Sequence, residues 1–559
     1  MEKNEILARA RDYIAKESDP TFKAQVEALI EADDMKELED RFYRDLEFGT
    51  GGLRGIIGGG FNRMNSYVVR RATQGLCDYI KDTVKGKNLS ACIAYDSRHY
   101  SDVFSLDAAL IFAANGIKAY LFTSLRPTPE LSFAIRKLGA DTGIVVTASH
   151  NPPAYNGYKA YWNDGSQITE PHDALIIDRV NSVTAIKSMP RDEAIAKGLL
   201  SMIDKEIDEP YVAMVRSKLL RPGLFTAMAK DVKVVYTPLH GTGAMHFERV
   251  MGDLGLSVLT VPEQKAPDGD FPTVAYPNPE EAAALKMALE LGARVKADVV
   301  MANDPDADRL GIAVPDGKGG FTLITGNQLG ALHADYMLLS LKELGRMPGK
   351  PAIIKSIVTT ELLSRIAASY GAECYNCLTG FKWIADTMRR FERKDGISAA
   401  AMTAEMTLYW RSKGKSLLER LDEIFVQHGF HEERGLSKYF EGPTGMTVMR
   451  GIMDGYRKSQ PATLGGIAVD RIRDVKTGKA WNVSDPGATS EVDLPASDAI
   501  QWYLADGTMV TVRPSGTEPK IKYYVLARTV VGAGGLAAAK KASATKVDAM
   551  LADIRKVIG

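Results

Sequence analysis

Three stretches of the chain share one pattern, in which an apolar run ends in polar or glycine-rich residues and passes into a segment with helical periodicity. They read SACIAYDSRHYSD (90–102), DVKVVYTPLHGTGA (231–244) and KPAIIKSIVTTELL (350–363). Buried parallel strands are continuous apolar runs of this kind, and helices cross over between them. The pattern therefore predicts three α/β domains.

Other segments fit the same organisation. Strands are predicted at KAYLFTS (118–124), TGIVVTA (142–148) and ADVVMAND (297–304), and apolar residues recur every three or four positions in EEAAALKMALELG (280–292). In such sheets ligands bind beyond the carboxyl ends of the strands. Chemically active residues are therefore expected directly after these runs.

The last hundred residues follow a different pattern. Short strands are predicted at GGIAVDRIRDV (465–475), TMVTVRP (508–514) and IKYYVLAR (521–528), followed by a final Ala/Lys-rich helix. Strands clustered before a helix, without alternation, indicate a small α+β domain. We therefore predict four domains, with these bounds: 1–205, 206–326, 327–456 and 457–559.

Composition narrows the class of protein. The 559 residues exceed what one hydrophobic core normally serves, and 45% hydrophobic with 25% charged residues is typical of a soluble globular protein. The 70 basic and 70 acidic residues cancel, so no global field attracts nucleic acid or an anionic membrane. The first residues, MEKNEILARARDYIAKES, form a charged amphipathic pattern instead of a secretory signal. These features predict a cytoplasmic protein and leave its oligomeric state open.

The four cysteines do not make a disulfide framework in a chain of this length. Cys374 and Cys377 form a C-x-x-C pair, but no second pair or histidine cluster stands at zinc spacing. Neither a redox nor a metal role is predicted for them.

NDPDADRLG (303–311) alternates three aspartates, Asp304, Asp306 and Asp308, after a predicted strand. In an extended segment their side chains project on one side, where they repel one another unless a cation neutralises them. An EF-hand loop is excluded because its sixth and twelfth positions are Arg309 and Pro315. The position at a strand end favours a site for a hard cation such as Mg²⁺ over an acidic solvated turn.

TVRPSGTEPKIKYY (511–524) places an arginine, two hydroxyls and a glycine between two predicted strands. Guanidinium, hydroxyl and backbone N–H groups suit a phosphate dianion. An ordinary polar hairpin turn explains the stretch equally well by itself.

TASHNPPAYNGYK (147–159) puts Ser149 after the apolar run GIVV. A G-x-S-x-G nucleophile elbow is excluded by the sequence, and His150 is poorly placed as its base because it is the next residue. A helix-capping serine is the structural alternative. An oxygen carrier, a cation site and a phosphate cradle are together what phosphoryl transfer needs, and this combination favours a catalytic Ser149.

In this order and spacing, TASHNPPAYNGYK, DPDADR and RPSGTEPK resemble the phosphoserine, magnesium and phosphate-binding loops of the α-D-phosphohexomutase superfamily. LEFGTGGLRG, AYDSRH, RPTPELSFAIR, YTPLHGTG and LTGFKWI extend the similarity, over nearly the whole chain, to the branch with phosphoglucomutase, phosphomannomutase and phosphopentomutase. The resemblance implies an α/β fold: three similar domains with mixed sheets and a smaller α+β C-terminal domain around a central cleft.

The resemblance also implies a mechanism. Ser149 would be phosphorylated, pass its phosphoryl group to a sugar phosphate, and recover the other phosphate from a bisphosphorylated intermediate such as glucose 1,6-bisphosphate. A phosphoserine oxygen, Asp304, Asp306 and Asp308 would hold Mg²⁺.

The remaining site residues follow from the same resemblance. Arg54 and Arg309 would add positive charge at the phosphoryl group. His150 and Lys159 would deprotonate a hydroxyl or bind phosphate, with Lys159 favoured as the base because a lysine near a cation can have a lowered pKa. Sugar-side residues would be Thr379, Gly380 and Lys382, and the distal phosphate would be gripped by Arg513, Ser515, Gly516 and Thr517.

One departure from the family concerns the sugar. The superfamily has a sugar-binding loop of Glu-Glu-Ser-Gly type, whereas GFKWIADTMRRFERKDGISAAAM (380–402) has none. The sequence predicts interconversion of sugar 1-phosphate and 6-phosphate, with glucose favoured, then mannose, and a pentose as another option. The alternatives are a catalytically weak sugar-phosphate-binding protein and a phosphatase of haloacid-dehalogenase type with Asp304 as phosphoryl carrier.

Overall fold

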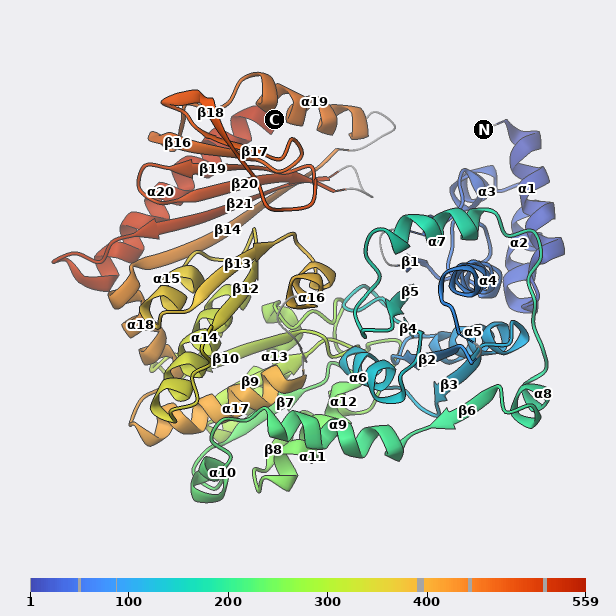
Figure 1. Cartoon of the computed structure of the whole chain (residues 1–559), viewed down its shortest axis with the longest axis horizontal. Coiled ribbons are helices and arrows are strands. Elements are labelled where there is room, and N and C mark those ends of the chain that lie inside the picture. The colour runs from blue at the N-terminus through green and yellow to red at the C-terminus, as the bar shows by residue number, and fades with distance from the viewer. Residues whose placement is uncertain are drawn as a thin grey trace. The chain divides into compact units, whose positions relative to one another are not determined.

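The computed structural model describes residues 2–48, 52–86, 88–389, 397–440, 445–515 and 520–558. The chain forms two compact units (Figure 1). One comprises Met1–Thr325 and Arg393–Gly414, and the other Gly326–Glu392 and Lys415–Gly559. The four domain bounds expected from the sequence stay a prediction; the third of them, 327–456, spans both units, because Arg393–Gly414 belongs to the first.

Three helices precede the first sheet: α1 (Lys3–Lys16), α2 (Pro20–Glu31) and α3 (Met35–Phe42). Asp19 and Asp34 cap α2 and α3 by accepting backbone N–H groups of the first turns. The helices share a core in which Tyr13 meets Phe42 and Phe61 edge to face. The amphipathic pattern at the start of the sequence is thus a packed helix.

The first sheet has the strand order β1-β5-β4-β2-β3-β6. β2, β3, β4 and β6 are parallel, whereas β5 pairs antiparallel with both β4 and β1, so the sheet is mixed. In β2, Ile93 belongs to one core and its neighbours Cys92 and Ala94 to a second, which explains the uninterrupted apolar run. The strands are β1 (Gly52–Ile56), β2 (Ser90–Tyr95), β3 (Lys118–Phe122), β4 (Thr142–Val146), β5 (Tyr155–Trp162) and β6 (Leu200–Ile203).

Helices cover both faces of this sheet. Residues of α4, α5 and α7 belong to the first core, and residues of α6 to the second. Their bounds are α4 (Ser66–Thr83), α5 (Ser101–Ala114), α6 (Thr128–Leu138) and α7 (His172–Asn181), with a short α8 (Arg191–Ala196) before β6.

The second sheet of this unit has the order β11-β10-β9-β7-β8 and is also mixed. Its strands are β7 (Val234–Thr237), β8 (Val258–Thr260), β9 (Val299–Asn303), β10 (Leu310–Pro315) and β11 (Phe321–Ile324). The helices α9 (Lys205–Ser217) and α10 (Gly223–Met228) precede these strands, and α11 (Gly243–Asp253), α12 (Pro262–Lys265) and α13 (Ala282–Val295) lie between them in sequence.

One helix of this unit comes from much later in the chain. α17 (Ile397–Ser412) contacts α9, α10 and α11, and residues 401–410 are buried on every side. Its buried Glu405 accepts the backbone N–H groups of Leu220 and Arg221 at 3.0 and 2.5 Å. A buried carboxylate needs hydrogen-bond donors in place of water, and here two backbone N–H groups of the loop between α9 and α10 supply them.

The second unit contains a parallel pair, β12 (Ala352–Ser356) and β13 (Glu373–Cys377), and a larger antiparallel sheet of order β14-β21-β20-β19-β16-β17-β18. The side chain of buried Gln501 in that sheet donates to the carbonyl of Ile357 at 3.0 Å, which ties the two together. The remaining strands are β14 (Phe430–Tyr439), β15 (Thr463–Leu464), β16 (Ile467–Asp474), β17 (Lys479–Asn482), β18 (Asp485–Glu491), β19 (Ile500–Leu504), β20 (Met509–Pro514) and β21 (Lys520–Thr529). The helices are α14 (Gly326–Glu343), α15 (Leu362–Ser369), α16 (Phe381–Arg389), α18 (Leu417–His428), α19 (Gly445–Lys458) and α20 (Gly535–Ile558).

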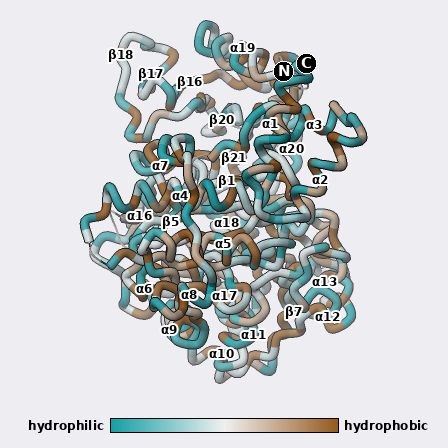
Figure 2. The backbone as a smooth tube through the Cα atoms, turned by 90° about the vertical axis from the view of Figure 1, so that its right-hand side faces the viewer, coloured by the Kyte–Doolittle hydropathy of each residue, from teal (hydrophilic) through white to brown (hydrophobic). Residues whose placement is uncertain are grey.

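Hydrophilic (teal) and hydrophobic (brown) stretches are interspersed along the backbone (Figure 2). Within the described residues, no helix is long and apolar enough to cross a membrane. All four cysteines are free thiols, with Cys374 and Cys377 three positions apart on β13 and therefore on opposite faces of the strand.

The contact between α4 and α7 leads to a stability prediction. A Cβ atom on Gly75 would lie 2.6 Å from the Cα of Val180. Gly75→Ala gains about 1 kcal/mol of helix propensity but costs about 1–3 kcal/mol by overpacking against backbone. We expect a lower Tm by calorimetry. Gly252→Ala in α11, where a Cβ meets nothing within 4 Å, is the matched control and should not lower it.

Candidate active site

Ser149 lies in the loop between β4 and β5, and its side chain is almost fully buried. Its φ of 52° is in the left-handed region, which non-glycine residues rarely adopt. The backbone N–H donates to Thr147 Oγ1 at 2.8 Å. Such a conformation persists only where surrounding contacts impose it, and it often marks a functional loop.

Arg98 imposes that conformation. Its buried guanidinium donates to four carbonyl oxygens of the loop at 2.5–3.0 Å, those of Ser149, Asn151, Pro152 and Tyr155. Carbonyl oxygens in a loop have no neighbouring strand to donate hydrogen bonds to them, and the guanidinium supplies these donors. One side chain thus determines the backbone path on which Ser149 is presented.

Buried Asp96 in turn holds Arg98, with 3.4 Å between its carboxylate and the guanidinium Nε. Asp96 also accepts from Thr147 Oγ1 at 2.6 Å and Ser101 Oγ at 3.0 Å. Burial raises the pKa of Asp96 although Arg98 and these donors oppose that shift. Our sequence analysis did not single out Asp96 or Arg98; the available signal was a D-x-R directly after a strand.

The three aspartates follow β9, in a loop where Ala307 also has a positive φ of 52°. Asp304 and Asp306 are fully buried, and the Asp308 side chain is 33% exposed. One oxygen from each carboxylate lies within 4.8 Å of the others. Ser149 Oγ donates to Asp304 Oδ2 at 2.6 Å, so the serine loop and the aspartate loop, 155 residues apart in sequence, meet at their side chains.

This cluster suits a divalent cation. Asp306 Oδ1 and Asp308 Oδ1 are buried and have no hydrogen-bond partner among the described residues. Burial and the neighbouring carboxylates raise the pKa of Asp304 and of Asp308. Burial also acts on Asp306, but Lys159 outweighs it and lowers the pKa of that carboxyl. Oxygen-only donors that repel one another are the set that a hard cation such as Mg²⁺ neutralises.

Lys159 is paired with these carboxylates. Its Nζ lies 2.8 Å from Asp306 and 3.6 Å from Asp308. Burial lowers the pKa of Lys159, but the two carboxylates raise it by more, so the net shift is upward. The lowered pKa expected from the sequence assumed a neighbouring cation and stays a prediction for the metal-loaded site, whereas the lysine in this structure faces anions. A protonated lysine favours ion pairing or phosphate binding over base catalysis.

His150 and two arginines complete the surroundings of Ser149. His150 Nδ1 lies 3.3 Å from Ser149 Oγ, and burial together with Arg309 and Arg54 lowers its pKa to about 4. Its imidazole is therefore neutral at neutral pH. Arg54 on β1 donates to Asn151 Oδ1 at 3.2 Å, and Arg309 Nε lies 3.8 Å from both Asp304 and Asp308.

The other predicted site residues belong to the second unit. Thr379, Gly380 and Lys382 lie between β13 and the first turn of α16, where Gly380 has a φ of 123°. Arg513, next to the end of β20, lies opposite Lys522, and the Ser515 N–H donates to the Lys520 carbonyl at 2.7 Å. The predicted Gly516 and Thr517 lie outside the described residues.

A second buried charged cluster joins α6, α9 and α11. His246 Nε2 lies 2.6 Å from Glu130 Oε2, and Asp208 is close enough to both to form a three-ligand set. Arg126, however, already pairs with both oxygens of Asp208 at 2.8 and 3.0 Å. Because this guanidinium supplies the positive charge, the cluster is an ion-paired junction between helices.

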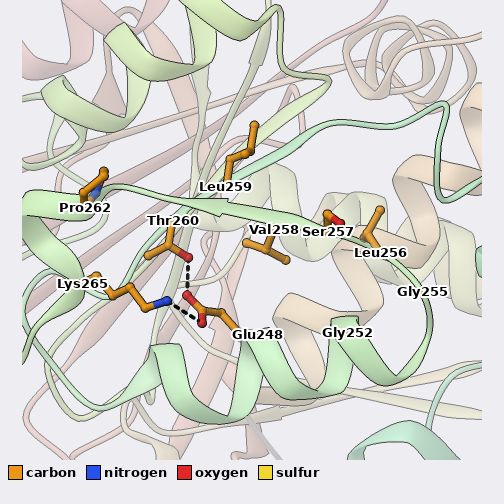
Figure 3. Close-up of a pocket in the computed structure, with 10 residues that line it drawn as sticks. All are labelled: Glu248, Gly252, Gly255, Leu256, Ser257, Val258, Leu259, Thr260, Pro262 and Lys265. Atoms are coloured by element: carbon orange, nitrogen blue, oxygen red, sulfur yellow. Dashed lines mark hydrogen bonds and ion pairs between the residues drawn. The ribbon is translucent and has the colours of Figure 1, made fainter.

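A pocket of about 630 Å³ lies elsewhere in the first unit, along the edge strand β8 (Figure 3). Glu248 points toward Thr260 and Lys265 across it and accepts from both, at 2.5 and 2.9 Å. None of the predicted site residues lines this pocket.

Comparisons with known proteins show the family to which the chain belongs. Family models described as phosphoglucomutase/phosphomannomutase, alpha/beta/alpha domains I, II and III match residues 45–187, 209–318 and 325–393. A Schizosaccharomyces pombe protein named "Probable phosphoribomutase" is 32% identical, covering 92% of this chain and 93% of that protein. A Staphylococcus saprophyticus phosphoglucomutase is 32% identical (89% and 93%), and a human phosphopentomutase 33% (89% and 87%).

Among solved structures, the phosphoglucomutase parafusin from Paramecium matches with a TM-score of 0.68 at 19% identity, over 92% of this chain and 94% of that one. A phosphoglucomutase/phosphomannomutase family protein from Burkholderia thailandensis matches with a TM-score of 0.66 at 18% identity, over 91% and 96%. These likenesses concern the fold. The predicted α/β class, with mixed sheets and a β-rich C-terminal region, is confirmed.

The chain belongs to the phosphoglucomutase/phosphomannomutase family of the α-D-phosphohexomutase superfamily. It is an isomerase of the sugar-phosphate mutase type.

The buried junction at Glu130 predicts a pH effect on stability. Burial raises the pKa of Glu130 from 4.5 to about 7, although His246 opposes the shift. A carboxyl with a raised pKa stabilises the fold below pH 4.5 and loses that contribution as the pH rises through 7. The Tm of Glu130→Gln relative to wild type should therefore rise across this window and level off above it. The corresponding change in the free energy of unfolding is at most about 3 kcal/mol.

Scanning fluorimetry at pH 4.5–8 measures this difference. Glu209→Gln, which changes an exposed carboxylate on α9, is the control and should give a flat difference. A flat difference for Glu130→Gln as well would contradict the assignment.

Proposed function

We propose that this enzyme interconverts the 1-phosphate and the terminal phosphate of a sugar through a phosphorylated Ser149. The observation that carries the proposal is the 2.6 Å contact between Ser149 Oγ and Asp304 within a cluster of three carboxylates. Phosphoryl transfer depends on positioning and on neutralising the phosphate charge, and this arrangement supports both.

Each half-reaction exchanges one bond. The bond from phosphorus to Ser149 Oγ breaks as a sugar hydroxyl oxygen bonds to the phosphorus. The hydroxyl proton passes to a base and then to Ser149 Oγ. We infer that the base is His150, whose Nδ1 lies 3.3 Å from Ser149 Oγ, or Lys159. The bisphosphorylated sugar then turns over and returns its other phosphoryl group to Ser149, so no phosphate is consumed.

Asp304, Asp306 and Asp308 would hold Mg²⁺ together with one phosphoserine oxygen, and the ion would neutralise charge at the transferring group. Lys159, Arg54 and Arg309 would bind the phosphoryl oxygens. Thr379, Gly380 and Lys382 would contact the sugar. The phosphate not being transferred would contact Arg513, Ser515, Gly516 and Thr517.

The sugar is the open part of the proposal. Relatives of similar identity are named phosphoglucomutase and phosphopentomutase. We favour glucose 1-phosphate, with the mannose and pentose phosphates as further substrates, in the cytoplasmic setting expected from the sequence. The missing Glu-Glu-Ser-Gly loop favours a second candidate, a protein that binds sugar phosphates but turns them over weakly.

Ser149→Ala should lower mutase activity by at least about a thousandfold, because it removes the phosphoryl-accepting oxygen. The assay follows glucose 6-phosphate from glucose 1-phosphate, with Mg²⁺ and a trace of glucose 1,6-bisphosphate. Ribose 1-phosphate is assayed in parallel. Ser105→Ala, which changes a buried serine on α5, is the control and should keep the wild-type rate.

Mass spectrometry of the wild type separates the alternatives. Phosphate on Ser149 with rapid turnover supports the mutase, and phosphate on Ser149 without turnover supports the binding protein. Phosphate on Asp304, or an active Ser149→Ala variant, rules both out.

A further inference from the structure

Thr128 connects two parts of the first unit at the aspartate cluster. It begins α6, which covers the first sheet, whereas Asp306 follows β9 of the second sheet, 178 residues later. The Thr128 N–H donates to the Asp306 carbonyl at 2.9 Å, and its Oγ1 donates to Asp306 Oδ2, also at 2.9 Å. The first N–H groups of a helix have no partner within the helix, so the backbone contact uses a donor that α6 leaves free.

These contacts decide which oxygen of Asp306 is available. Oδ2 accepts from both Thr128 Oγ1 and Lys159 Nζ, at 2.9 and 2.8 Å. Oδ1 is buried and has no hydrogen-bond partner within the described ranges. Two donors on one oxygen fix the plane of a carboxylate, and the other oxygen then points in a defined direction. In Asp306 that oxygen is left for a ligand from outside the protein.

Thr128 is itself held firmly. Pro127 and Pro129 flank it, and the N–H of Arg126 donates to the Tyr95 carbonyl at 3.0 Å. Two residues on, Glu130 pairs with His246 at 2.6 Å. The hydroxyl of Thr128 therefore has little freedom to follow Asp306 if the aspartate turns, and Asp306 must conform to it.

We propose that Thr128 is a positioning residue for the magnesium site, which holds Asp306 so that Oδ1 faces the cation. This inference rests on the metal site of the proposed function. Residues that orient a metal ligand through a hydrogen bond typically contribute about 10–100-fold to metal affinity. Thr128 contacts neither the cation nor the sugar in this account, and its effect on activity should be recovered at high Mg²⁺.

The test compares Thr128→Val, which removes the hydroxyl and keeps the shape, with Thr128→Ser, which keeps the hydroxyl. Binding of Mn²⁺ to the purified full chain is measured by electron paramagnetic resonance, with Mg²⁺ as competitor. We expect Thr128→Val to weaken binding by about 10–100-fold and Thr128→Ser to stay close to wild type. Thr73→Val, which removes a buried hydroxyl from α4, is the matched control and should bind normally.

Each outcome decides one point. If the wild type binds neither ion, the metal site of the proposed function fails and this inference fails with it. If the wild type binds and Thr128→Val binds equally well, only the positioning role is wrong. Equal weakening in Thr128→Val and Thr128→Ser also overturns it, because the hydroxyl would not be the cause. Circular dichroism checks folding, and Thr128→Ala replaces the valine variant if that variant does not fold.

Discussion

Like charges at Asp304, Asp306 and Asp308 repel one another in an interior that screens them poorly, and the neighbouring residues are arranged around this repulsion. Lys159 and Arg309 place positive charge beside the three carboxylates, and the hydroxyls of Ser149 and Thr128 donate to two of them. These donors come from three separate parts of the first unit. The cluster therefore depends on both sheets being correctly placed.

Close backbone packing positions the aspartate loop and the serine loop. A Cβ on Gly241 would lie 2.2 Å from the Cα of Pro305, and the N–H of Thr242 donates to the Pro305 carbonyl at 2.9 Å. On the serine side, a Cβ on Gly157 would lie 2.5 Å from the Thr147 carbonyl oxygen. Glycine at both positions lets one loop lie directly against another backbone. The aspartate loop and the serine loop thus have little room to move relative to the strands that carry them.

This arrangement suits a mutase. A phosphoryl group must be held by an oxygen nucleophile beside enough positive charge to stabilise it, yet must be released to either end of the sugar. Arg98 contributes by fixing the backbone of Ser149 through four carbonyl contacts, without addressing the phosphoryl group itself. Arg98, which holds the loop, is thus distinct from the residues that would meet the substrate in the proposed function.

The sequence by itself predicted the α/β class, the strands that carry the candidate site, and Ser149 and the three aspartates as candidate residues. These follow from local pattern, because a buried strand must be apolar throughout and polar residues after it are exposed to a ligand. Tertiary structure decided which distant groups meet. α17 packs against α9 and α11 although the helices next to it in sequence belong to the other unit, and Thr128 reaches Asp306 across 178 residues.

The protonation state of Lys159 is another property that depends on tertiary structure. Sequence reasoning favoured a lowered pKa, whereas the fold places the carboxylates of Asp306 and Asp308 within 4 Å of Lys159, and these raise it. Local pattern depends on what each residue contributes to its own strand or helix. Pairing, burial and pKa depend on neighbours brought together by folding, which a single sequence does not specify.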